Sequence, residues 1–171
     1  EPLPPHDLYL RQAAEAGRGI RILHQDLWEM LITFILSQRK TIPAIRLCVE
    51  KLCQAAGKPL AAKGANLPAP LYGFPSPKAL CELTLEDIRA TGAGYRAPYL
   101  LATASMAAAG EPLQAWSALP DEELQRRLMA FPGVGVKVAR CVMLFGYHRL
   151  HICPVDVWME RVIQSVYGGR D

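Results

Sequence analysis

The stretch that decides the fold is residues 128–162, LMAFPGVGVKVARCVMLFGYHRLHICPVDVWMERV. It contains a tight turn at 131–135, FPGVG, and then a largely apolar run at 136–147 that predicts a helix. Further on, the motif PVDV predicts the start of a second helix. Two of its charged residues, Lys137 and Asp156, stand out against this apolar background, and we expect the chemistry of the stretch to depend on them.

The turn has the composition of an anion-binding helix start. Gly133 and Gly135 permit positive φ values and the close approach of another backbone. The amides of Val134, Gly135 and Val136 are expected to face outward at a helix N-terminus, where the first N–H groups lack helical partners and bind a phosphate well. The spacing fits neither a P-loop nor a dinucleotide-binding fingerprint. A plain glycine turn between two helices is the alternative.

Composition bounds the kind of protein. A chain of 171 residues with 51% hydrophobic residues suits one domain, or two small subdomains that share a cleft. The net charge of +3 permits a local nucleic-acid-binding patch without requiring one. The five cysteines form no C-x-x-C pair, which predicts reduced thiols and an intracellular protein. No apolar run reaches membrane-spanning length, so no membrane partner is expected.

The whole chain is predicted to be all-α. Apolar residues recur with a period near 3.6 and show no alternating pattern typical of strands. Glycine, asparagine and proline fill residues 58–75, where no regular element is expected. Besides 136–147, helices are expected at 8–16, 27–38, 42–56, 77–82, 85–90, 95–109, 113–117 and 120–130.

The decisive stretch resembles a known family. The motif FPGVGxK at 131–137, with PVD at 154–156, is similar to the helix–hairpin–helix (HhH-GPD) DNA glycosylase superfamily. Within it, the residues 134–141 and 154–159 are closest to the branch of the 8-oxoguanine DNA glycosylases with AP lyase activity.

The resemblance implies that 1–171 is a glycosylase core, a helical bundle with two small helical subdomains flanking an active-site cleft. One subdomain would be 24–119; the other would join 1–23 to 120–171, with the hairpin at 120–147. This branch also has a β-rich N-terminal domain and C-terminal helices, and the resemblance implies that residues 1–171 do not include them.

The two charged residues suit N-glycosidic bond cleavage. Breaking that bond develops positive charge at C1′ of the sugar, which a carboxylate stabilises, and a neutral amine can attack the same carbon to leave an imine. The resemblance makes Lys137 the Schiff-base nucleophile and Asp156 its electrostatic partner. Apolar neighbours and the positive helix end favour the neutral amine. The alternatives are an N-cap role for Asp156 and a solvent-directed Lys137.

Two further segments are predicted to contact DNA. In GAGYRAPY at 92–99, the resemblance makes Tyr95 the wedge that enters the duplex and Arg96 the reader of the base opposite the extruded nucleotide. A helix restart with a solvated Arg96 is the alternative. At 37–41, SQRKT resembles the corner that reaches the orphaned base, so Arg39 and Lys40 are predicted to bind DNA. Eukaryotic relatives carry an asparagine run here, so recognition of the opposite base is expected to differ.

Other groups receive smaller roles. Cys141 matches a cysteine that lines the base pocket of the family, with a small core residue as the alternative. His148, His151 and Cys153 match no zinc-binding spacing, so no metal site is predicted. The resemblance implies no required cofactor, only a structural monovalent cation at the hairpin. An iron–sulfur motif would lie beyond residue 171, and the 8-oxoguanine-like pattern argues against it.

Together these features predict a base-excision-repair DNA glycosylase with β-lyase activity. The resemblance implies a monomer that removes an oxidised purine, 8-oxoguanine, from double-stranded DNA, in the cytoplasm or nucleoid of a bacterium or the nucleus of a eukaryote. One alternative is an enzyme of the same fold for another lesion; purely alkyl-base glycosylases generally lack the lysine that this chain has at Lys137. The other is a non-catalytic DNA-binding module, which would show salt-sensitive duplex binding without turnover or a covalent adduct.

Overall fold

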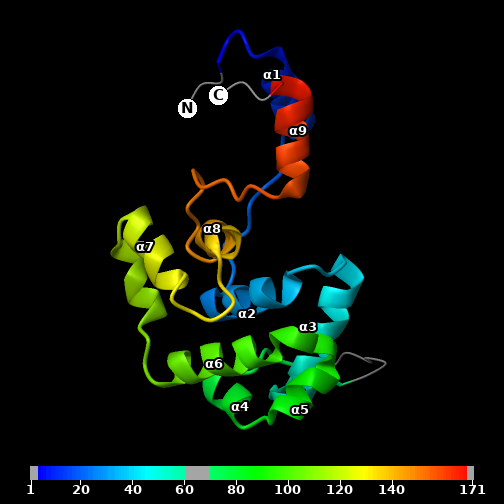
Figure 1. Cartoon of the computed structure of the whole chain (residues 1–171), viewed down its shortest axis with the longest axis vertical. Helices are drawn as coiled ribbons and strands as arrows, with labels where there is room; N and C mark the ends of the chain where they lie inside the picture. The colour runs from blue at the N-terminus through cyan, green and yellow to red at the C-terminus, as the bar shows by residue number, and fades with distance from the viewer. Residues whose placement is uncertain (1–3, 61–69, 169–171) are drawn as a thin grey trace.

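The computed structural model describes residues 4–60 and 70–168, which form layers of helices around the central helix α2 (Figure 1). The prediction of an all-α chain is confirmed. The elements are α1 (Leu8–Ala16), α2 (Leu27–Ser37), α3 (Ile42–Ala56), β1 (Pro59–Leu60), β2 (Leu71–Tyr72), α4 (Pro77–Cys81), α5 (Leu85–Ile88), η1 (Arg89–Ala93), η2 (Gly94–Arg96), α6 (Ala97–Ala108), η3 (Leu113–Ala118), α7 (Asp121–Leu128), α8 (Val136–Phe145) and α9 (Val157–Tyr167).

Helix α2 forms the centre of the core. It begins at Asp26, whose carboxylate accepts the amide of Glu29 at 2.9 Å. Its apolar residues lie nearly all round the helix, and Ile32, Ile35 and Leu36 are wholly buried. Helix α2 packs against α8 on one side and against α3 and α6 on the others (Figure 1). Because α2 packs against helices on several sides, its C-terminal end at Ser37 has a fixed position, and so do the residues that follow directly.

A pair of very short strands departs from the prediction. Pro59 pairs with Tyr72 and Leu60 with Leu71, in an antiparallel ladder. The expectation that 58–75 contains no regular element is therefore wrong at both ends of the segment, and 61–69 lie outside the described residues. Gly73 donates its amide to the Lys58 carbonyl at 2.9 Å and so brings the two ends together.

The segment between α5 and α6 is more broken than the sequence predicted. The expected helix at 85–90 ends at Ile88, and the π-helical turn η1 follows. Gly92 and Gly94 take positive φ values of 94° and 60°, which break the helical path. The expected helix at 95–109 consequently begins at Ala97, after the 3₁₀ turn η2.

Helices α1 and α9 lie side by side at one end of the molecule (Figure 1). The Tyr167 hydroxyl donates to Asp7 Oδ2 at 2.8 Å, and the Tyr9 and Tyr167 rings meet edge to face. Neither helix buries a side chain fully, in contrast to α2 and α8. Across 4–60 and 70–168, no helix is both long enough and apolar enough to cross a membrane.

Candidate active site

The hairpin turn, residues 131–135, is fixed from beneath by apolar packing. Phe131 and Val134 are buried, and the Val134 amide donates to the Phe131 carbonyl at 3.1 Å. The expectation that this amide faces outward is therefore wrong, because the tight turn uses it internally. Gly133 has the expected positive φ of 80°, and a Cβ at that position would lie 2.7 Å from Tyr99 Cδ2.

Gly135 differs from Gly133. Its φ of −92° is ordinary, so this glycine does not use the positive φ that its lack of a side chain permits. It is exposed, and a Cβ there would meet no atom within 4 Å. Gly135 is the N-cap of α8 and supplies no side-chain cap, so the positive end of α8 opens onto free space at this residue. This is the geometry that a phosphate group needs.

Lys137 and Asp156 belong to different helices, yet the charge of Lys137 acts on the Asp156 carboxyl. Lys137 is exposed in the first turn of α8, and Asp156 is the N-cap of α9. Asp156 Oδ1 accepts the amides of Trp158 and Met159, each at 3.0 Å, so the N-cap interpretation is confirmed. The pKa of the Asp156 carboxyl lies below its ordinary value. The largest cause is the hydrogen bond from the Met159 amide, and the Trp158 amide and the Lys137 ammonium lower the pKa further.

Cys141 lies beside this pair. Its side chain is buried on α8, one turn after Lys137, and burial raises the pKa of the thiol. The Lys137 charge opposes that rise in the pKa, and the Asp156 charge adds to it. Both charges therefore reach the thiol, which places Lys137, Cys141 and Asp156 in one electrostatic neighbourhood.

In the wedge segment, residues 92–99, the most exposed ring is that of Tyr95, and it lies over the buried cation Arg96. Tyr95 is 55% exposed, whereas Arg96 is 5% exposed. The Arg96 guanidinium carbon lies 4.2 Å from the centre of the Tyr95 ring, and its terminal nitrogens donate to the carbonyls of Ala93 and Gln38. The alternative of a solvated Arg96 is wrong. In this conformation the guanidinium points into the protein, whereas the Tyr95 ring is exposed.

The corner, residues 37–41, carries one free and one engaged cation. Arg39 is exposed, with a positive φ of 50°. The Lys40 ammonium contacts the Gly92 carbonyl of the wedge segment. The predicted DNA contact of Lys40 would thus have to compete with this internal bond, whereas Arg39 is directly available.

Sequence reasoning missed two residues that connect these parts. The Gln38 side chain donates to the Gly133 carbonyl at 2.9 Å and to the Ile35 carbonyl at 3.1 Å, and the Tyr99 ring lies against Gly133. A glutamine just after a helix has the same local pattern as a solvated helix end. Nothing in the sequence near Gln38 or Tyr99 signals the contact.

The histidines after α8 have structural partners. His151 contacts the Asp121 carboxylate. His148 lies within hydrogen-bond distance of the Ile22 carbonyl and stacks on His24, with ring centres 5.1 Å apart. Among the residues with described positions, no group of three or more His, Cys, Asp or Glu side chains is arranged to hold a metal ion.

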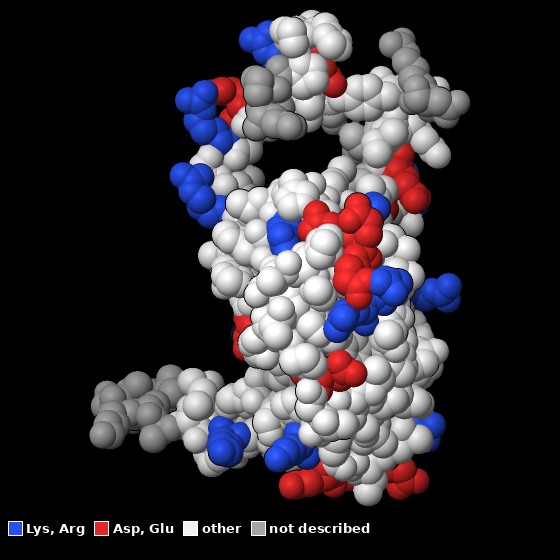
Figure 2. Space-filling model, turned by 90° about the vertical axis from the view of Figure 1, so that its left-hand side faces the viewer, with Lys and Arg blue, Asp and Glu red and all other residues white. Residues whose placement is uncertain are grey.

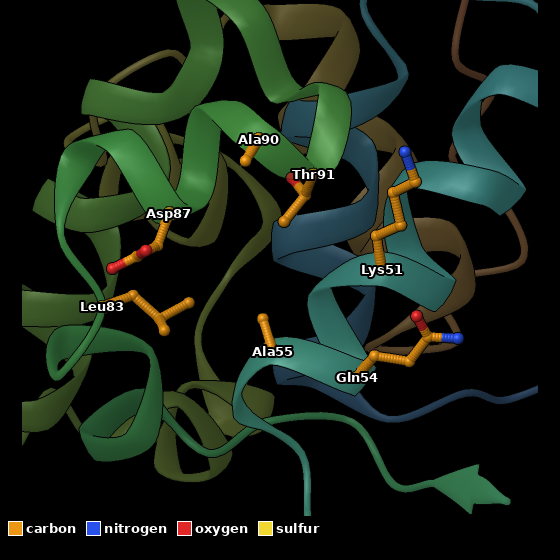
Figure 3. Close-up of a pocket in the computed structure, with 7 residues that line it drawn as sticks. All are labelled: Lys51, Gln54, Ala55, Leu83, Asp87, Ala90 and Thr91. Carbon is orange, nitrogen blue, oxygen red and sulfur yellow. The ribbon is translucent and has the colours of Figure 1, made fainter.

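A pocket of about 560 Å³ lies away from the candidate site (Figure 3). Lys51, Gln54 and Ala55 of α3 form one wall (Figure 3). The opposite wall comes from the connection between α4 and α5, from α5 and from η1: Leu83, Asp87, Ala90 and Thr91. None of the predicted catalytic or DNA-binding residues lines it, so the chemistry of the site does not depend on this pocket.

The face around α7 carries charges of both signs (Figure 2). Glu123 pairs with Arg126 and Arg127, and Asp121 pairs with Arg149. Such an interleaved surface gives little net attraction for a phosphate backbone.

The chain matches known proteins over nearly its whole length. A family model described as the HhH-GPD superfamily base excision DNA repair protein matches residues 32–171. An N-glycosylase/DNA lyase of Saccharomyces cerevisiae is 33% identical over 162 residues, which are 88% of this chain and 42% of that protein. The N-glycosylase/DNA lyase OGG1 of Arabidopsis thaliana is 36% identical over 148 residues, 82% of this chain and 40% of that protein.

A solved structure gives the same picture. The 8-oxoguanine glycosylase/lyase of Clostridium acetobutylicum in its apo form superposes with a TM-score of 0.87 at 37% identity. The match covers 96% of this chain and 57% of that one. The chain thus spans about half the length of the relatives it matches.

Proposed function

The chain belongs to the HhH-GPD superfamily of base excision DNA repair proteins, and we propose that it excises an oxidised purine, 8-oxoguanine, from duplex DNA and then cleaves the strand as an AP lyase. The observation that carries the proposal is the placement of Lys137 in the first turn of α8 and of Asp156 at the N-cap of α9, near enough for the Lys137 charge to lower the pKa of the Asp156 carboxyl. A structural hairpin alone would require neither charge at this place.

The duplex would be held at the end of α8. Anionic phosphate oxygens suit the positive helix end and the exposed backbone at Gly135. A monovalent cation coordinated by carbonyl oxygens of the turn would add to this attraction. The cation is part of the proposal, because oxygen is the ligand type that such an ion prefers and the turn offers backbone carbonyls.

The wedge would make room for extrusion of the damaged nucleotide. Tyr95 is exposed and can fill the gap that the extruded nucleotide leaves in the base stack. Arg96 would read the orphaned base after leaving the Gln38 carbonyl, to which it now donates. Arg39, exposed at the neighbouring corner, would contact the same strand region.

The chemistry would then proceed at C1′. The neutral amine of Lys137 attacks C1′, and the base departs with the electron pair of the N-glycosidic bond and gains a proton. Asp156, ionised because its pKa is lowered, stabilises the positive charge that develops at the sugar. Ring opening gives an imine between the lysine nitrogen and C1′. Loss of a C2′ proton expels the 3′ phosphate, and water then hydrolyses the imine and restores the lysine.

Cys141 would lie at the wall of the base pocket. The raised pKa keeps its thiol protonated at neutral pH, so it offers a small, neutral, weakly donating surface. We place the damaged base against this thiol because Lys137 must reach the sugar of the same nucleotide. The division into 24–119 and a second subdomain of 1–23 with 120–171 would put the wedge on one side of the cleft and the lysine on the other.

The test is base release and strand cleavage from a duplex with 8-oxoguanine opposite cytosine. The protein should release the base and nick the strand, whereas Lys137→Gln should do neither while still binding the duplex. A protein that binds duplex in a salt-sensitive way but releases no base from 8-oxoguanine or other lesions would instead be a DNA-binding module. Such a repair enzyme would work where the DNA is, the nucleoid of a bacterium or the nucleus of a eukaryote.

A further inference from the structure

One residue outside the predicted site touches three parts of it. Gln38 follows the last residue of α2, and its side-chain nitrogen donates to the carbonyls of Ile35 and Gly133. Its own backbone carbonyl accepts a bond from the Arg96 guanidinium. Gln38 is thus bonded to the central helix, to the hairpin turn and to the wedge segment at once.

The chemistry of the glutamine amide is required for these contacts. Both side-chain partners are carbonyl oxygens, which only accept, so the –NH₂ group and not the amide oxygen must face them. The two N–H bonds of one nitrogen match two acceptors. A glutamate of the same size would face both carbonyls with a carboxylate when ionised, and a methionine would offer neither donor.

The contacts close into a ring. From Gln38 the path runs to Gly133, whose backbone lies against Tyr99. The Tyr99 ring meets Tyr95 edge to face, with centroids 6.4 Å apart, and Tyr95 lies over the Arg96 guanidinium. Arg96 returns to the Gln38 carbonyl. The hairpin turn and the wedge segment are therefore joined through one side chain and one backbone carbonyl of the same residue.

We propose that Gln38 is a positioning residue that sets the hairpin turn and the wedge segment at a fixed separation, so that the protein binds a backbone phosphate and the orphaned base together. This inference rests on the function proposed above. Helix α2, buried at the centre of the fold, provides the fixed reference. When Arg96 leaves Gln38 to read the orphaned base, the side chain of Gln38 still holds the turn.

The proposal predicts a specific defect when the side chain is changed. Gln38→Met leaves the Gly133 carbonyl without its hydrogen-bond donor, so the hairpin turn is no longer held at a fixed distance from the wedge segment. Affinity for a duplex should fall roughly 10-fold, the usual scale for losing a hydrogen bond to a partly buried group. The preference among bases opposite the site should shrink as well, although Arg96 itself is unchanged.

The experiment measures binding without catalysis. Duplexes carrying a tetrahydrofuran abasic analogue opposite each of the four bases are titrated by fluorescence anisotropy with the unchanged protein, Gln38→Met and Gln38→Glu. The matched control is Gln54→Met, on the exposed face of α3. Gln38→Met should bind more weakly and discriminate less between opposite bases, whereas Gln54→Met should match the unchanged protein in both respects.

Gln38→Glu adds a readout that a merely structural role would not change. A carboxyl held against two carbonyl oxygens should have a pKa raised above the ordinary value of about 4.3. Its affinity relative to the unchanged protein should therefore be low at pH 8 and recover as the pH falls to about 5 and below, where the protonated carboxyl has an O–H to donate. On an abasic duplex, Gln38→Glu should have a higher KM for strand cleavage than the unchanged protein. Its kcat should stay within about two-fold of the unchanged protein's, since Lys137 and Asp156 are not altered.

The outcomes separate this inference from the proposed function. Affinity and opposite-base preference that stay unchanged in Gln38→Met would overturn the positioning role while leaving the enzyme intact. A defect in Gln38→Met together with a protein that releases no base would support the positioning role and sink the proposed enzyme. An unchanged protein that binds none of the duplexes would overturn both. Equal loss in Gln54→Met would also count against the role.

Discussion

The ring of Tyr99 lies directly against Gly133, so closely that a Cβ at the glycine would come within 2.7 Å of Cδ2 and 2.9 Å of Cγ. The glycine also has a φ of 80°, in the left-handed region. Helix α6, which carries Tyr99, therefore packs against the hairpin turn through a contact that only glycine permits.

This contact predicts that Gly133→Ala destabilises the fold. The new methyl group meets the ring, and alanine is strained at this φ, so the free energy of unfolding should fall by about 2–3 kcal/mol. The matched control is Gly135→Ala, where φ is −92° and no atom lies within 4 Å. It should keep its thermal midpoint yet bind duplex more weakly, because its methyl group occupies the phosphate approach. Equal midpoints for the two variants in thermal unfolding would contradict this account.

Asp156 caps α9 and is proposed to stabilise charge at the sugar, and one substitution can separate these two roles. Asparagine is as good an N-cap as aspartate, so Asp156→Asn should remain folded. It lacks the negative charge, and base release should slow on the order of 100-fold or more. Single-turnover rates on an 8-oxoguanine duplex give the measurement. Base release at the rate of the unchanged protein would remove Asp156 from the mechanism.

The same variant predicts a pH dependence of stability. The folded protein lowers the pKa of Asp156 below its ordinary value of 3.8, chiefly through the Met159 amide. The charged carboxylate therefore stabilises the fold above that ordinary value, and this contribution is lost as the pH falls through the lowered pKa. The thermal midpoint of the unchanged protein should exceed that of Asp156→Asn at pH 7. The difference between the two thermal midpoints should vanish in strongly acidic solution. A difference that persists or widens there would contradict the proposed stabilisation by the charged carboxylate.

Tyr95 is predicted to act on the duplex and not on the fold. Its ring is more than half exposed, so Tyr95→Ala should change the thermal midpoint little. Release of a base-paired lesion should slow roughly 10- to 100-fold, the scale of one lost base–aromatic stacking contact. Tyr95→Phe keeps the ring and should retain most activity. Equal activity of all three proteins on paired 8-oxoguanine would show that the ring is no wedge.

The helices and the cap of α9 could be predicted from the sequence because their signals are local. Asp26 and Asp156 sit within three residues of the amides they accept, and apolar periodicity marks α2. The resemblance placed the lysine and the aspartate in register, and the structure brings them into one electrostatic neighbourhood. Their catalytic roles stay predictions.

Other features could not be read from the chain because they depend on distant partners. Gln38 bonds to a carbonyl 95 positions away, and Arg96 to one 58 positions away. The expectation of a solvated arginine as an alternative failed for this reason: an arginine next to a tyrosine has the same local pattern whether it faces water or the end of another helix. The outward amide expected at Val134 failed because the turn closes onto Phe131.

The central claim is that Lys137 forms a covalent bond with the sugar of the damaged nucleotide. The most direct measurement is borohydride reduction during incubation with 8-oxoguanine and abasic duplexes, followed by peptide mass analysis of the trapped complex. The account predicts a DNA adduct on Lys137 from both duplexes and none with Lys137→Gln. An adduct on another residue, or none on either duplex from a protein that binds both, would contradict it.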